Sequence, residues 1–113
     1  MSTNFRPAPE PVKLAVKRRL EQTNPGAVLG LDSVQLCPIP HVPFDATVFI
    51  YEQNGRKILV GELCRPDLPH IYAAFAMKEN AKANAAIIMS VLLSLSRTLQ
   101  EDPRFARNII ALN

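Results

Sequence analysis

The segment 46–64, ATVFIYEQNGRKILVGELC, decides the fold of this chain. It contains two runs of strand-forming residues, 46–53 and 56–64, and the dipeptide Asn54-Gly55 joins them. A two-residue type I′ turn prefers this dipeptide, because both central residues of the turn need positive φ angles. The segment therefore predicts an antiparallel β-hairpin.

The register of this hairpin follows by counting outward from the turn. The predicted opposing pairs are Gln53 with Arg56, Tyr51 with Ile58, Phe49 with Val60, Thr47 with Glu62, and Asp45 with Cys64. The other face carries Ala46, Val48 and Ile50 against Leu59, Gly61 and Leu63. Because both faces are largely apolar, we expect a sheet that is covered on both sides, by helices or by a partner.

On the N-terminal side of the hairpin, the sequence predicts one helix and one strand. Residues 11–22 carry an apolar stripe at helical spacing, and Pro11 suits the first position of a helix. The Asn-Pro-Gly sequence at 24–26 ends this helix. Residues 27–37 then supply the first strand of the sheet.

On the C-terminal side, a long helical pattern predicts a helix that begins at Leu68 or Pro69, with Asp67 as its N-cap. It extends toward Pro103, either unbroken or interrupted near Lys78-Glu79-Asn80, and residues 105–112 form a short final element, a strand or a helix.

Together these elements predict a fold of the α+β or α/β class. It consists of an N-terminal helix, a three-stranded sheet with the Asn-Gly hairpin, a long C-terminal helix and a short final element. A chain of 113 residues, 48% of them hydrophobic, has room for one core, so 12–113 is expected to be a single domain. Residues 1–11, with three prolines at alternate positions, predict a flexible, extended arm without backbone hydrogen bonds of its own.

Two features of the sequence predict a cytoplasmic location. No apolar stretch with a charged leader follows Met1, and two cysteines in such a chain are expected to be reduced thiols. The most apolar run, 85–95, is well short of the roughly 20 residues that a membrane-spanning helix needs. We therefore expect no membrane partner.

The hairpin register places Asp45 and Glu62 on one face at diagonal positions, close enough for their carboxylates to share a cation. Asp45 at the start of a strand, the Asn-Gly hairpin and the stretch LVGELCRP at 59–66 resemble the core of the restriction-endonuclease-like nucleases, whose motif is PD-(D/E)xK. The order of elements over about 11–112 is similar as well. The resemblance implies that Asp45 and Glu62 hold Mg²⁺, with Glu21 as an additional acid, for hydrolysis of a DNA phosphodiester.

The sequence departs from the nuclease motif at two positions. Phe44 stands where the motif has proline, and Cys64 stands where it has the catalytic lysine. A neutral thiol does not balance phosphate charge as an ammonium group does. The resemblance therefore implies little or no DNA cleavage by this chain.

A second candidate metal site uses every cysteine and histidine of the sequence. Two Cys and two His side chains form a tetrahedral Zn²⁺ site when the fold brings them together. The candidates are Cys37, His41, Cys64 and His70. The same residues also offer a Cys-His nucleophile pair, for which the sequence supplies no orienting third group.

Two surfaces are candidates for binding. Lys13, Lys17 and Arg18 on the first helix would contact the phosphates of a nucleic acid, in a chain with a formal net charge of +3. The run 85–95 is apolar on nearly all sides, so a second copy of the chain is expected to cover it. The expected interface residues are Ile88, Leu92, Leu93 and Leu95.

The sequence leaves two functions open. The first is a small, non-catalytic interaction or regulatory protein that forms a homo-oligomer and needs no cofactor. The alternative is a metal-dependent, nuclease-like protein that binds nucleic acid, active or degenerate, with Mg²⁺ as its cofactor. The corresponding partners are a second copy, another protein or DNA.

Overall fold

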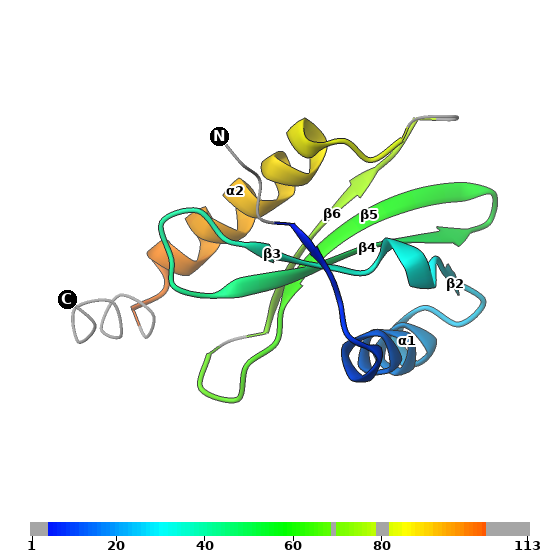
Figure 1. Ribbon diagram of the computed structural model, residues 1–113, viewed down its shortest axis with the longest axis horizontal. Helices are drawn as coiled ribbons and strands as arrows, with labels where there is room; N and C mark the ends of the chain where they lie inside the picture. The colour runs from blue at the N-terminus through cyan, green and yellow to red at the C-terminus, as the bar shows by residue number, and fades with distance from the viewer. Residues whose placement is uncertain (1–4, 69, 79–81, 104–113) are drawn as a thin grey trace.

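The computed structural model describes residues 5–68, 70–78 and 82–103 (Figure 1). Over these ranges the chain forms one antiparallel sheet of six strands and two α-helices. The elements are, in order, β1 (Arg6–Pro7), α1 (Glu10–Thr23), β2 (Val28–Leu29), a 3₁₀ turn (Leu31–Ser33), β3 (Gln35–Pro38), β4 (Asp45–Gln53), β5 (Arg56–Leu63), β6 (Ile71–Ala76) and α2 (Ala85–Glu101).

The predicted hairpin is confirmed. Strands β4 and β5 pair in the expected register, with Phe49 opposite Val60 and Thr47 opposite Glu62. Asn54 and Gly55 have φ angles of 54° and 76°, as a type I′ turn requires.

One predicted pair, Asp45 with Cys64, does not form. Strand β5 ends at Leu63, and Asp45 pairs instead with Pro38 of β3.

The expectation of a three-stranded sheet is wrong, because the sheet has six strands. Their order is β1-β3-β4-β5-β6, and β2 pairs with the second half of β4. The single strand expected over 27–37 is divided into β2 and β3 by the 3₁₀ turn. The Ser33 hydroxyl fixes this turn, since it accepts a hydrogen bond from the Ile50 amide at 2.8 Å.

The N-terminal segment takes part in the sheet. An extended arm without backbone hydrogen bonds was expected over 1–11, whereas Arg6 and Pro7 pair with β3. The Ala8 amide donates to the Val34 carbonyl at 3.0 Å, and Ala8 is buried. Helix α1 begins at Glu10, directly after Pro9.

A further correction concerns residues 71–76, which were expected to be helical. They form β6, because the outer edge of β5 offers a full row of backbone groups, from Ile58 to Leu63, that six residues can pair with. The second helix begins only at Ala85, where the Asn84 side chain caps it by accepting from the Ile87 amide at 3.0 Å. The predicted final element, 105–112, lies outside the described residues.

Helix α2 packs on one face of the sheet, over β5 and β6. Ile88, Leu92 and Leu95 of this helix, which were expected to contact a second copy, are buried in the chain's own core against residues such as Val48 and Leu59. The sheet of the same chain therefore packs against the apolar side of α2 that a second copy was expected to cover. Of the four predicted interface residues, Leu93 alone is exposed, at 46%.

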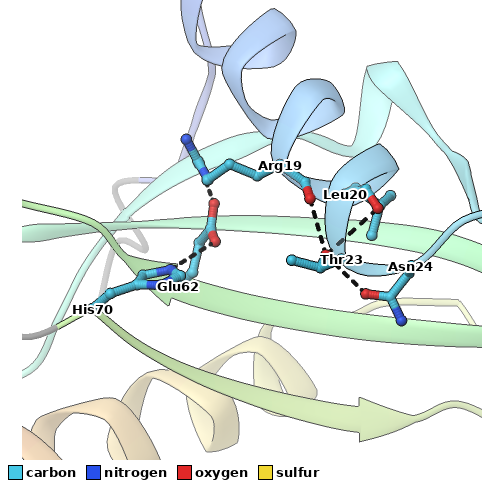
Figure 2. A network of polar contacts seen from close by, with 6 residues as sticks. All are labelled: Arg19, Leu20, Thr23, Asn24, Glu62 and His70. Atoms are coloured by element: carbon cyan, nitrogen blue, oxygen red, sulfur yellow. Dashed lines mark hydrogen bonds and ion pairs between the residues drawn. The ribbon is translucent and has the colours of Figure 1, made fainter.

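Helix α1 packs on the opposite face through Val16 and Leu20, which are buried near Phe49 and Val60. Figure 2 shows α1 on one side of the strands and α2 on the other. The expected arrangement of helix, sheet and helix is therefore present. Neither described helix is long and apolar enough to cross a membrane.

Candidate functional site

The face of the sheet beneath α1 is covered only in part. A groove of about 660 Å³ remains between the C-terminal half of α1 and strand β6. Its walls, which define the β6 groove, are Val16, Arg19, Leu20, Gln22, Thr23 and Asn24 on the helix side and Phe49, Tyr51, Val60, Glu62, His70, Tyr72 and Ala74 on the sheet side. The floor is thus mainly apolar and aromatic, with a few polar groups along one wall.

The central polar group of the β6 groove is Glu62 on β5, which points toward α1 and is 7% exposed. Its Oε1 accepts a hydrogen bond and ion pair from Nη2 of Arg19, and its Oε2 lies 3.3 Å from Nε2 of His70 (Figure 2). Both oxygens of the carboxylate are therefore engaged. A carboxylate this deeply buried needs such partners to offset its desolvation.

Arg19 occupies this position because of where it lies on α1. It follows the buried stripe residue Val16 by three positions, so it lies beside that stripe and faces the sheet. Its Nη2 contacts Glu62, whereas its Nε is buried without a hydrogen-bond partner among the described atoms. The Thr23 hydroxyl donates to the Arg19 carbonyl at 2.9 Å and completes the last turn of the helix.

A second hollow, of about 590 Å³, lies on the other side of the Arg19–Glu62 pair, below the N-terminal half of α1. We call it the Asp45 hollow, because Asp45 lines it together with Glu62 and Cys64. Asp45 accepts a hydrogen bond from Nη2 of Arg6 at 2.8 Å.

Asp67, which was expected to cap a helix, lies beyond β5 and instead accepts from Nε of Arg65 at 3.1 Å. This hydrogen bond lowers the pKa of Asp67. The Arg65 guanidinium also lies over the Phe44 ring, 4.4 Å from its centre.

The two predicted Mg²⁺ ligands thus line the same hollow, but each is engaged by an arginine. Asp45 binds Arg6, and Glu62 binds Arg19. The third candidate acid, Glu21, lines a different hollow, beside β2. Over the described ranges, no group of three or more His, Cys, Asp or Glu side chains could hold a metal ion.

The four candidate Zn²⁺ ligands are not brought together. Cys37 is buried in the core beneath α2, whereas Cys64 is exposed at the Asp45 hollow on the α1 side. His70 contacts Glu62, and His41 is exposed in a loop with a φ of 66°. Burial and, to a smaller extent, the nearby Asp45 carboxylate raise the pKa of Cys37 to about 11, although Arg6 opposes both effects. Such a thiol is a poor nucleophile at neutral pH.

The three basic residues proposed for phosphate contacts do not share one surface with the β6 groove. Nζ of Lys13 lies 3.9 Å from Oε1 of Glu10, Lys17 lines the small hollow beside β2, and Arg18 is exposed.

Sequence reasoning considered Arg19 only as part of the basic run 17–19, as a phosphate contact and not as the partner of Glu62, and it did not single out Tyr72. The position of Arg19 beside the apolar stripe was an available signal, because a guanidinium there faces the sheet. Tyr72 required knowledge that 71–76 is a strand.

No family model matches the chain, and neither the curated proteins nor the solved structures compared with it give a significant match.

Proposed function

We propose that this chain is a non-catalytic interaction protein that binds a segment of a partner protein in the β6 groove. The observation that supports this function best is the half-covered sheet: α1 leaves an open groove of about 660 Å³ with an apolar floor. Apolar surface that is exposed and bordered by polar residues is typical of interaction sites.

The polar groups of the groove favour binding over catalysis. A general base or metal ligand needs a carboxylate oxygen or imidazole nitrogen that is free to act. Both oxygens of Glu62 are bound by Arg19 and His70, and Asp45 is bound by Arg6. The Glu62–Arg19 ion pair therefore holds α1 against the sheet, and the Asp45–Arg6 ion pair joins the start of β4 to β1.

The shape and lining of the groove favour a polypeptide as its occupant. One wall is the exposed end of a helix, with Gln22 and Thr23, and the other is β6, where Tyr72 is 69% exposed. Exposed tyrosine is enriched at protein interfaces, since its ring provides large contact area at low entropic cost. An apolar peptide face would lie on Val60 and Ala74, with polar contacts to the Arg19–Glu62 pair at its border.

The location of the chain in the cell belongs to this proposal as well. Cys37 and Cys64 are both free thiols. Free thiols suit a reducing compartment, so we propose that the protein acts in the cytoplasm.

A displayed library of random peptides tests the proposal. We expect the immobilised protein to enrich peptides with several apolar residues, and the substitution Gln22→Trp to weaken their binding at least tenfold by filling the groove mouth. Glu21→Trp is the matched control, because it places the same ring on the same turn of α1 but on the side of the hollow beside β2. Failure to enrich any peptide, or equal weakening by both variants, would contradict the proposed site.

A further inference from the structure

Strand β6 forms one end of the described sheet, and no described residue pairs with its outer edge. Its sequence, IYAAFA, contains no charged residue and no proline. Edge strands normally carry such residues, because they prevent pairing with another chain. The opposite end of the sheet follows that rule, since β1 has only two residues, Arg6 and Pro7.

The backbone groups that point outward from β6 can be identified from its pairing. The Met77 amide donates to the Lys57 carbonyl at 2.9 Å, in the same register as the rest of the β5–β6 ladder. In an antiparallel ladder the bonded positions alternate, so the odd-numbered residues of β6 bond to β5. The amides and carbonyls of Tyr72, Ala74 and Ala76 therefore point away from the sheet.

We propose that this edge pairs with β6 of a second copy of the chain, antiparallel and about a two-fold axis at Ala74. In this register Ala74 faces Ala74 of the second copy, and Tyr72 faces Ala76. All three outward-facing residues are then paired with one another, which gives about six backbone hydrogen bonds at two per facing pair. A two-fold axis of this kind makes the contact closed and self-complementary.

The side chains of β6 fit the same register, because each aromatic residue of the strand meets an alanine. Tyr72, 69% exposed, meets Ala76 on the α1 side of the sheet, and Phe75, 50% exposed, meets Ala73 on the α2 side. Both exposed aromatic rings of the strand would thus gain cover, and no like charges would face each other. This complementarity of the strand to itself favours a second copy over an unrelated strand.

The pairing also has a consequence for the β6 groove. The axis runs perpendicular to the sheet, so the α1-facing sides of both copies lie on the same side. The two grooves then become neighbours across the joined β6 strands, with an α1 helix beyond each. The inference goes beyond the peptide-binding function and stands on the strand edge, not on the groove.

Light scattering at micromolar concentration tests the assembly. We expect twice the chain mass of 12.5 kDa for the natural protein and a single chain mass for Ala74→Pro. Proline at this position removes an outward-pointing amide, and edge strands accept it, so the far-ultraviolet circular dichroism should stay unchanged. Leu93→Arg, which changes the exposed residue of α2, should keep the doubled mass. A natural chain that is a monomer, or a doubled mass for folded Ala74→Pro, would overturn the proposal.

Cross-linking tests the register separately, and decides the case if Ala74→Pro does not fold. In a Cys64→Ser background, Ala74→Cys places two thiols on the axis, with Cα atoms about 5.5 Å apart, a separation that a disulfide spans. Oxidised glutathione, which accepts the two electrons, should convert this variant to a covalent dimer. Ala76→Cys is the control, because its two copies lie four residue steps apart, roughly 13 Å. Equal cross-linking of both variants, or of neither, would refute the register.

Discussion

Gly61 of β5 lies beneath α2, and the substitution Gly61→Ala should loosen the packing between the helix and the sheet. A methyl group at this position would lie 2.5 Å from Cγ1 of Val91 and 3.3 Å from Cδ1 of Leu95. The first distance is far below ordinary van der Waals contact, and Val91 cannot rotate away easily, because a β-branched residue in a helix has one strongly preferred χ1 rotamer. The helix must therefore shift outward.

The size of the effect follows from two opposing contributions to the free energy of unfolding. Overpacking of a core costs about 1 to 3 kcal/mol. Replacement of glycine by alanine restricts the unfolded chain and returns about 0.4 to 1 kcal/mol. We expect a net loss of about 1 to 2 kcal/mol, so the overpacking cost prevails.

Urea unfolding followed by circular dichroism measures this loss, and Val91→Ala provides the matching partner. That substitution removes Cγ1, so in the double variant the methyl group on residue 61 fills part of the space that Val91 vacates. The double variant should be more stable than the sum of the two single losses predicts, by about 1 kcal/mol or more. A neutral Gly61→Ala variant, or strictly additive losses, would show that α2 does not approach β5 at this residue.

Three further predictions concern the charged and thiol groups. Glu62→Ala should destabilise the fold by about 1 to 3 kcal/mol in urea unfolding, because it leaves the partly buried Arg19 without its partner. Arg19→Met in the same background should recover part of this loss, and an unaffected unfolding midpoint would contradict the role of the pair. Thiol titration with a chromogenic disulfide at pH 8 should show one fast cysteine, Cys64, and one that reacts only on unfolding, Cys37, because the pKa of Cys37 is raised to about 11 from 9.0 in the folded state. Since the unfolded chain loses this proton at a lower pH than the folded chain, the free energy of unfolding should fall as the pH rises through this interval. Fast reaction of both thiols would contradict the burial of Cys37. Millimolar Mn²⁺ should leave the melting temperature unchanged, because the two candidate acids are already bound by arginines; a rise that Asp45→Ala abolishes would restore the nuclease-like alternative.

The sequence predicted the parts of this fold that local chemistry specifies. The Asn54-Gly55 turn sets its own backbone angles, and the alternation on either side then fixes the register from Thr47 to Glu62. The apolar character of both hairpin faces correctly indicated layers on both sides of the sheet. These predictions hold because the residues that decide them are close together in the chain.

The predictions of secondary structure were wrong where the same residues are compatible with both a helix and a strand. Alanine-rich sequence such as 71–76 is compatible with a helix, and only the unpaired edge of β5 makes it a strand. The placement of this strand then decides which side of the sheet is open. For a related reason, three of the four residues predicted at an interface on α2 are buried in the chain's own core, because β5 and β6 lie beneath that helix.

The candidate site depended on tertiary structure most of all. Local sequence determined that Glu62 is on the same face of the hairpin as Thr47, but not which helix lies above that face. The α1 layer brings Arg19 to Glu62 across 43 positions of the chain, and the end of β6 brings His70 to the same carboxylate. Turn angles and strand register are set by neighbours in the chain, whereas burial, ion pairing and open edges are set by which surfaces meet when the layers pack.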